Sequence, residues 1–303
     1  MDAHAASGVA AVVVTYNRLE KLRRCVRSVL DQTSSPAMAI VVDNASTDGT
    51  KDWLIRSAHE DPRIRPVHLD ENTGGAGGFH TGIKLALREG VEYVWVMDDD
   101  CYPRPSALSL LMEAFCSHRS DLGDFPAFAC SRVLCGDERS PCHMNTPTLL
   151  PQWDLPYSQH TPALAAQSCS FVSCLFRADD VRRLGLPLKE YFIWLDDVEF
   201  TFRLARDRYG LVVLDSLAIH DLPTNERVNW SQVTPENAWK YRYGARNEAS
   251  WRLRNQGVRS YIWLVRSIRR QLSDGSVSWQ CRFGIFWYLI KALQFNPRPE
   301  FPD

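Results

Sequence analysis

The sequence predicts an α/β fold in which helices flank a mainly parallel sheet, followed by a helical C-terminal region. Two patterns support this prediction. Apolar, β-branched runs alternate with amphipathic helical segments over residues 9–100, and from Pro235 onward the periodicity is helical. The chain has 303 residues, of which 45% are hydrophobic and 23% charged, so it can form one large domain or two modest ones and is not a largely disordered protein.

The first predicted elements form one βαβ unit. Residues Val9 to Val14 make a continuous apolar run that ends in Thr15-Tyr16-Asn17, as expected for a strand buried on both faces. In the helix that follows, from Leu19 onward, apolar residues recur at helical spacing and basic residues occupy the other side. A second strand, Ala39 to Val42, ends in Asp43.

Two further strands continue this alternation. A short helix through Trp53-Leu54 leads to a strand at Ile64 to Leu69. The segment Gly74-Gly75-Ala76-Gly77-Gly78 then precedes a helix that extends to about Arg88, and Tyr93 to Met97 forms the fourth strand. Ligands of such a sheet are expected at the carboxyl ends of its strands.

Beyond residue 118 the pattern weakens. Residues 118–168 are rich in proline and polar residues, which predicts a variable insert. The later expected elements are a strand at Phe171 to Phe176, a helix over Glu199 to Asp207, short strands at Leu211 to Leu214 and Leu217 to Ile219, and a helical face of Tyr261, Leu264, Val265, Ile268 and Leu272. We therefore expect a sheet-containing domain over residues 1–222 and a helical, basic region over residues 223–303.

Charge is segregated along the chain. The net charge is only −1, which argues against nucleic acid as a partner of the whole protein. Residues 240–282 nevertheless contain ten Lys or Arg and two acids, a net charge of +8. Either this is a solvated basic helix face, or the apolar stripe and the flanking arginines Arg259, Arg266, Arg269 and Arg270 contact anionic lipid headgroups.

Location and redox state follow from what the sequence lacks. No apolar run is long enough to cross a bilayer, and Met1 to Gly8 show no secretion signal, so we expect a cytoplasmic protein, with peripheral contact to the inner face of the cell membrane as the alternative for residues 240–282. Nine cysteines in such a protein are expected to be reduced. Cys130, Cys135, Cys142 and His143 lack the paired spacing of a zinc site.

The strongest chemical signal is the triplet Asp98-Asp99-Asp100, which directly follows an apolar strand. Residues two apart at a strand end point the same way, so Asp98 and Asp100 can present two hard oxygen ligands to one divalent cation. Asp99 would point away from them, in a structural or ribose-binding role. His220 is a structural histidine unless the fold brings it to this pair, where it becomes a metal ligand.

The glycine-rich segment after the third strand has two interpretations. It does not match a dinucleotide fingerprint, which requires its glycines after the first strand and an acidic residue further on. The glycines either let the backbone pass close to a bound nucleotide or sugar, or allow a tight turn and close helix packing.

A second acidic cluster lies at Trp194-Leu195-Asp196-Asp197-Val198-Glu199-Phe200. One aspartate can be explained as a residue that favours a helix N-terminus. Two aspartates together with Glu199 favour a general base for a hydroxyl nucleophile.

Together these segments resemble the family 2 glycosyltransferases of the GT-A fold. The resemblance covers about residues 9–255 and rests on motifs that occur in the family's order. The motifs are Val14-Thr15-Tyr16-Asn17-Arg18, Val41-Val42-Asp43-Asn44-Ala45-Ser46-Thr47-Asp48-Gly49, Asn72-Thr73-Gly74-Gly75-Ala76-Gly77-Gly78-Phe79, Met97-Asp98-Asp99-Asp100, Leu195-Asp196-Asp197-Val198-Glu199-Phe200 and Ala218-Ile219-His220.

The resemblance implies an inverting transferase that uses a nucleotide-diphospho-sugar. It implies Mn²⁺ or Mg²⁺ on Asp98, Asp100 and His220, and Asp197 as the base, with Asp196 as the alternative because this chain has Leu-Asp-Asp where the family usually has Glu-Asp or Gly-Asp. The implied donor-binding residues are Thr15, Asn17, Arg18, Asp43, Asn72, Gly75, Asp98 and Asp99. We also expect Trp194 and Glu199 to bind the acceptor, together with Tyr243 and Arg246, since residues 241–247 interleave aromatic residues with arginines, which suits a diphosphate or a sugar ring.

The glycine segment and the aspartate triplet look most similar to the galactofuranosyltransferase branch, with rhamnosyltransferases next. We therefore expect UDP-galactofuranose as the donor, with dTDP-rhamnose as the alternative, and a glycan or a lipid-linked acceptor. Two remoter alternatives are a sugar-phosphate nucleotidylyltransferase, which would favour a glycine-rich, basic loop after the first strand, and a carbohydrate-binding module without activity.

Overall fold

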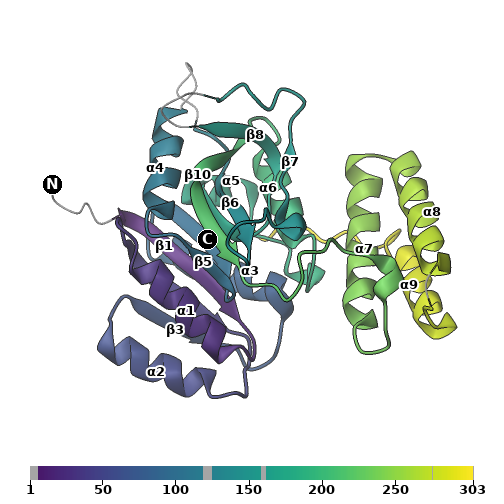
Figure 1. Ribbon diagram of the computed structural model, residues 1–303, viewed down its shortest axis with the longest axis horizontal. Coiled ribbons are helices and arrows are strands. Elements are labelled where there is room, and N and C mark those ends of the chain that lie inside the picture. The colour runs from purple at the N-terminus through teal and green to yellow at the C-terminus, as the bar shows by residue number, and fades with distance from the viewer. Residues whose placement is uncertain (1–5, 119–124, 158–161, 275, 303) are drawn as a thin grey trace.

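The computed structural model describes residues 6–118, 125–157, 162–274 and 276–302. Parts of the expected signal-free N-terminus and of the expected insert lie outside these ranges. In the described ranges, helices cover both faces of one large sheet, and three further helices follow (Figure 1). No helix in the described ranges combines the length and the apolar character needed to span a bilayer.

The first half of the sheet confirms the four predicted strands. In spatial order these parallel strands are β3 (Ile64–His68), β2 (Pro36–Asp43), β1 (Ala6–Thr15) and β4 (Tyr93–Asp98). The helices between them are α1 (Leu19–Leu30), α2 (Thr50–Glu60) and α3 (Gly74–Arg88). The strands thus bring their carboxyl ends to one edge of the sheet.

The second half of the sheet corrects the prediction for residues 118–168. The described part of this segment adds strands to the sheet instead of forming an insert outside it. The strands within this segment are β6 (Ala129–Cys135), β7 (Thr148–Leu149) and β8 (Ala163–Ser168). The second half of the sheet also contains β5 (Cys101–Pro103), β9 (Val172–Arg177) and β10 (Gly210–His220). The two short strands expected before His220 are one strand, β10, with an irregularity between Val213 and Leu217.

Strand β9 runs antiparallel to both of its neighbours, β4 and β6. Strand β6 is therefore parallel to β4, and β10 is parallel to β6. As a result β10 also ends at the edge where β1, β2 and β4 end, and His220 is its last residue.

A chain of buried hydroxyl groups links the irregular positions of the second half. Ser173 has a positive φ of 59° at the register shift of β9, and Ser216 lies in the register shift of β10. The Oγ atom of Ser131 on β6 lies 2.6 Å from that of Ser173 and 2.7 Å from that of Ser216. The Trp95 indole N–H donates to Ser173, and Ser216 donates to the carbonyl of Ala107.

Two apolar layers hold the helices on the sheet. One face of the sheet packs against α1, α2 and α4 (Ala107–Ser117) through Leu22, Leu54 and Leu111. The other face packs against α3, α5 (Ala178–Leu184) and α6 (Asp196–Leu204). This arrangement leaves the strand ends for functional side chains.

The last three helices form a bundle with a hydrophobic cluster of its own (Figure 1). They are α7 (Ala238–Asn255), α8 (Val258–Asp274) and α9 (Trp279–Lys291). The chain then returns to the sheet-containing part, where the N–H of Leu186 donates to the carbonyl of Glu300. Whether residues 1–222 and 223–303 are separate domains stays a prediction.

Candidate active site

The carboxyl end of β4 carries the first acidic cluster. Ligand atoms of Asp98, Asp100 and His220 lie within 4.8 Å of one another. His220 Nε2 is 3.1 Å from Asp100 Oδ1, so the fold brings the histidine to the aspartates as the metal interpretation requires. His220 Nδ1 lies 2.6 Å from Asn145 Oδ1, which orients the ring.

Asp99 points away from this group towards β1. The hydroxyl of Thr15 donates to Asp99 Oδ2 over 2.7 Å. Arg18 lies between the two directions, because its Nη1 is 3.3 Å from Asp99 Oδ1 and 2.7 Å from Asp100 Oδ2. Thr15, Arg18, Asp99 and Asp100 thus form one hydrogen-bonded unit beside Asp98.

The carboxylates of this unit differ in their pKa values. Burial and the neighbouring Asp100 raise the pKa of Asp98. Burial alone would also raise the pKa of Asp100, but the hydrogen bond with His220 and the charge of Arg18 hold it below its usual value. Burial raises the pKa of Asp99 to about 6 despite Arg18. The cluster therefore gains stability from each cation beside it.

The loops after β1 and β2 brace each other at the same edge. Asn17 Oδ1 accepts from the N–H of Thr47 over 2.7 Å. Asp43 accepts from the N–H of Ser46 over 2.9 Å, and its other oxygen lies 3.1 Å from His68 Nδ1. Asn17 and Asp43 thus shape the rim of the site. His68 joins them, although no motif of the sequence pointed to this residue.

The glycine-rich segment lies inside α3, in its first two turns, instead of before it. An added Cβ at Gly78 would be 2.5 Å from Val14 Cγ1, and one at Gly82 would be 2.4 Å from Val12 Cγ1. These glycines allow close packing of helix on sheet. Gly75 differs, because a Cβ there would meet nothing within 4 Å, and Asn72 Oδ1 accepts from the neighbouring N–H of Gly74.

The second acidic cluster follows a loop with an unusual backbone. Phe192, Trp194 and Leu195 have positive φ values of 65°, 67° and 71°, in a backbone region that residues other than glycine rarely adopt. Helix α6 begins directly afterwards, at Asp196. The conformation of the loop thus determines where α6 begins and therefore where the side chains of Asp196 and Asp197 lie.

Asn247 of α7 holds this loop in place. Its side chain is fully buried, and its Nδ2 lies 2.9 Å from the carbonyl of Tyr191, 3.0 Å from that of Ile193 and 3.0 Å from that of Trp194. An amide nitrogen has two hydrogens, so these carbonyls share them. Asn247 was missed by sequence reasoning, because one amide in a helix carries no local signal of partners 53–56 residues away.

The two aspartates of the second cluster differ in exposure. Asp196 is buried, with 7% of its surface exposed, and burial together with the charge of Asp197 raises its pKa well above the usual value. Asp197 is partly exposed, and Oδ1 accepts from the N–H of Val198 over 2.7 Å. Burial raises the pKa of Asp197 to about 6. The charge of Asp98 adds to the rise in the pKa of Asp196, so these two carboxyl groups lie near enough to interact electrostatically.

The residues expected to bind the acceptor are engaged in packing. Glu199 forms a two-point ion pair with Arg203, with N–O distances of 2.9 Å. The Tyr243 ring stacks on Phe192 at 4.8 Å. Trp194 packs edge-on against the ring of Tyr241. Arg246 donates to the carbonyl of Glu190 and lies 3.7 Å from the Phe295 ring. Their roles towards an acceptor stay predictions.

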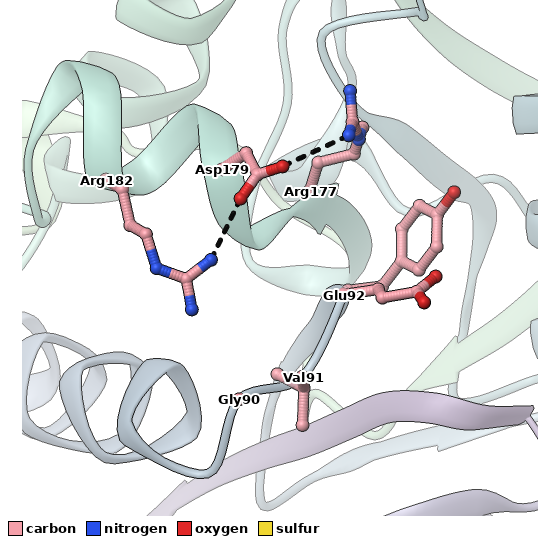
Figure 2. Close-up of a pocket in the computed structure, with 7 residues that line it drawn as sticks. Gly90, Val91, Glu92, Arg177, Asp179 and Arg182 are labelled. Atoms are coloured by element: carbon pink, nitrogen blue, oxygen red, sulfur yellow. Dashed lines mark hydrogen bonds and ion pairs between the residues drawn. The ribbon is translucent and has the colours of Figure 1, made fainter.

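A pocket of about 370 Å³ lies away from this site. It is lined by Gly90, Val91 and Glu92 at the start of β4, whereas Asp98 lies at the end of that strand. Asp179 bridges Arg177 and Arg182 beside it, at 3.2 Å and 2.9 Å (Figure 2). The two arginines that line this pocket are thus already paired with Asp179.

Comparison with known proteins shows the family of the chain. The family model for glycosyl transferase family 2 matches residues 10–185. The chain is 30% identical over 218 residues to galactofuranosyltransferase GlfT1 of Mycolicibacterium smegmatis, covering 65% of either chain, and 29% identical over 221 residues to GlfT1 of Mycobacterium tuberculosis, covering 72% of this chain and 71% of that one. It thus spans slightly less than two thirds of the first of these relatives.

Two solved structures share the fold. Staphylococcus aureus TarS 1–349 has a TM-score of 0.60 at 18% identity, covering 94% of this chain and 80% of that one. GalNAc-T7, solved with UDP, GalNAc and Mn²⁺, has a TM-score of 0.59 at 15% identity, covering 80% and 50%. The sheet and its helices are therefore a GT-A fold, and the chain belongs to the family 2 glycosyltransferases.

Proposed function

We propose that this enzyme transfers galactofuranose from UDP-galactofuranose to a hydroxyl of a glycan or a lipid-linked acceptor, with inversion at the anomeric carbon. The observation that carries the proposal is the convergence of Asp98, Asp100 and His220 within 4.8 Å of one another, within electrostatic reach of Asp196. The cluster of Asp98, Asp100 and His220 suits a metal diphosphate, and the pair Asp196 and Asp197 suits a base.

The first cluster fits a divalent cation. Two carboxylates and an imidazole converge within 4.8 Å, and such a mixed oxygen and nitrogen set suits Mn²⁺, with Mg²⁺ as the alternative. Asp98, Asp100 and His220 would hold the ion, and it would neutralise charge on the leaving nucleoside diphosphate. Arg18, half exposed beside Asp100, supplies a second positive charge at this place.

The base is Asp197 in this proposal. A base must be ionised, and the pKa of about 6 leaves Asp197 ionised at neutral pH, whereas burial and the charge of Asp197 raise the pKa of Asp196 well above its usual value. Asp197 is also the more exposed of the two. It would accept the proton of the acceptor hydroxyl as that oxygen attacks the anomeric carbon and the nucleoside diphosphate leaves. Asp196 would orient the acceptor.

Thr15, Asn17, Arg18, Asp43, Asn72 and Gly75 would surround the donor. The support is their position at the rim formed by the ends of β1 and β2 and the start of α3, with Gly75 facing open space. For the sugar itself the support is the similarity to two galactofuranosyltransferases. A dTDP-rhamnose donor stays the alternative.

The first test is donor binding measured by thermal shift. UDP, dTDP, GDP and NAD are compared with and without Mn²⁺, because a ligand at 100 times its Kd stabilises a protein by about 2.7 kcal/mol. We expect a Mn²⁺-dependent shift with UDP, lost in Asp100→Ala. A shift with dTDP alone would select rhamnose. No nucleotide shift from folded protein would contradict the proposed donor site.

The second test is transfer by Asp197→Asn. We expect turnover to fall roughly 10²- to 10⁴-fold while the UDP shift is retained, because only proton transfer is removed. Asp207→Asn, the same change on an exposed aspartate beyond α6, is the matched control. Loss of UDP binding in Asp197→Asn would overturn the base assignment.

A further inference from the structure

Helix α9 presents an apolar stripe to solvent. Trp279, Phe283, Trp287 and Ile290 are 73%, 67%, 49% and 54% exposed. Their spacing of four, four and three residues places them on one side of the helix. The opposite side, with Ile285 and Leu289, packs in the core of the bundle. The stripe is thus additional to what the bundle needs for its own stability.

This stripe is not the one expected from the sequence. On α8, Leu264, Ile268 and Leu272 are buried in the bundle core. The expected lipid contact through that stripe is therefore ruled out by packing while the bundle is folded. The arginines of α8 face solvent, as their position opposite the stripe predicts.

Two basic residues flank the α9 stripe. By helical spacing Arg282 borders one side of it and Lys291 the other. Helix α8 lies alongside, since the Tyr261 hydroxyl donates to the carbonyl of Leu289 over 3.2 Å, and it carries the exposed Arg269 and Arg270. Residues 276–298 contain no acidic residue. Indole rings beside cations suit the headgroup region of an anionic bilayer.

Two other occupants fit the surface less well. The chain's own C-terminal segment leads away to the sheet-containing part, where Glu300 contacts Lys189. A second copy of the chain would bring two surfaces of the same positive charge together, which is unfavourable.

We propose that the α9 stripe docks on an anionic lipid surface. The aromatic side chains enter the boundary between headgroups and acyl chains, and Arg282 and Lys291, which border the stripe, lie at the lipid phosphates. This inference does not rest on the proposed donor or acceptor, because binding to the lipid surface needs neither.

Vesicle sedimentation without donor or acceptor tests it. Full-length protein is mixed with vesicles of phosphatidylcholine alone or with phosphatidylglycerol added. We expect binding to the anionic vesicles that weakens with salt, and a loss of about tenfold or more in the partition coefficient for Phe283→Ser and for Trp287→Ser. Trp153→Ser, which changes a 48% exposed tryptophan outside the bundle, should bind as the unchanged protein does.

Three results would overturn the proposal. They are absence of binding by folded protein, equal binding to neutral and anionic vesicles, and unchanged binding by both stripe variants. If the protein does not bind vesicles, and if it is a dimer that Trp287→Ser converts to a monomer, the stripe instead binds a second copy of this chain. Melting temperatures of the variants separate these results from misfolding.

Discussion

The carboxyl of Asp197 has a raised pKa, whereas the proposed role as a base requires its ionised form. Burial raises the pKa to about 6, and the N–H groups of Val198 and Phe171 oppose the shift only in part. The value still lies below neutral pH, so a base at this position would be ionised under ordinary conditions. Two pH effects follow, one on the rate and one on stability.

The rate should depend on pH through this group. We expect kcat/KM to rise about tenfold per pH unit below pH 6 and to level off above it, because only the carboxylate accepts a proton. The measurement is a pH profile of transfer from pH 4.5 to 8. A flat profile across pH 5–7 would contradict the base assignment.

Stability should change in the opposite direction. The unfolded carboxyl ionises near its usual pKa of 3.8 and the folded one near 6, so ionisation destabilises the fold above pH 6 and the effect disappears below about pH 4. Asp197→Asn should therefore melt above the unchanged protein at pH 8, with the difference lost at pH 4. Asp207→Asn, the same change at an exposed aspartate, is the control in the same thermal scans.

Asn247 should act as a positioning residue. Asn247→Asp places an oxygen against three carbonyls and removes their donor, so the loop before Asp196 should relax from its positive φ values. We expect kcat to fall about 10- to 100-fold while the Kd for UDP stays within about threefold, since a misplaced catalytic group costs rate more than binding. Binding and turnover of the folded fraction are measured together.

The matched control is Asn255→Asp, the same change at the exposed last residue of α7. If Asn247→Asp only lowers the melting temperature and keeps the full kcat, Asn247 has a structural role alone.

At the scale of an element, α3 separates the two interpretations of its glycines. Gly82→Ala should destabilise the fold by about 1–3 kcal/mol, because its Cβ would be 2.4 Å from Val12 Cγ1. Gly75→Ala should leave stability unchanged, since its Cβ meets open space, and should weaken UDP binding if the donor passes there. Denaturant unfolding measures the stability of the two variants, and UDP titration measures their affinity for UDP. Equal loss of stability in both variants would remove the distinction.

Strands were predictable where their side chains carry the pattern. The run Val9 to Val14 is unbroken, and β1 follows it closely. Strand β6 reads Ala-Cys-Ser-Arg-Val-Leu-Cys, in which buried cysteines act as small apolar residues and Ser131 joins the hydroxyl chain. Its burial depends on partners elsewhere in the chain, so the segment resembled an insert.

The site was predictable where one short segment carries the chemistry. Asp98 and Asp100 need only a strand end to point together, and the order of the motifs led to His220. Asn145 and Asn247 could not be found in this way. Each amide acts through the fold, on partners 75 and 53–56 residues distant, and amides are common on any surface.

At the scale of the whole molecule, Glu300 connects the C-terminal segment to the sheet-containing part. Its carboxylate contacts Lys84 and His80 of α3 and Lys189 of the short helix Lys189–Tyr191. Hydrogen bonds from Lys84 and Lys189 lower the pKa of Glu300 to about 2. The C-terminal segment is thus fastened beside the loop that precedes Asp196.

Glu300→Gln should weaken this connection in a pH-dependent way. A lowered carboxyl pKa stabilises the fold above the unfolded value of 4.5, and the effect is lost as the pH falls towards 2. Because the side chain is 36% exposed, we expect a loss of no more than about 1 kcal/mol per ion pair at pH 7 and low salt. Unfolding at pH 7 and pH 3 is the measurement, and Glu89→Gln at the end of α3 is the control. An equal loss at both pH values would contradict the ionic explanation.

The hydroxyl chain of the sheet has a fixed polarity. An indole N–H can only donate and a carbonyl can only accept, so Trp95 and the Ala107 carbonyl force Ser173 to donate to Ser131 and Ser131 to donate to Ser216. Sliding β9 or β10 by one residue would turn these hydroxyls to the other face and leave both ends of the chain without partners. The hydrogen bonds of these three hydroxyl groups thereby favour a single register of β6, β9 and β10.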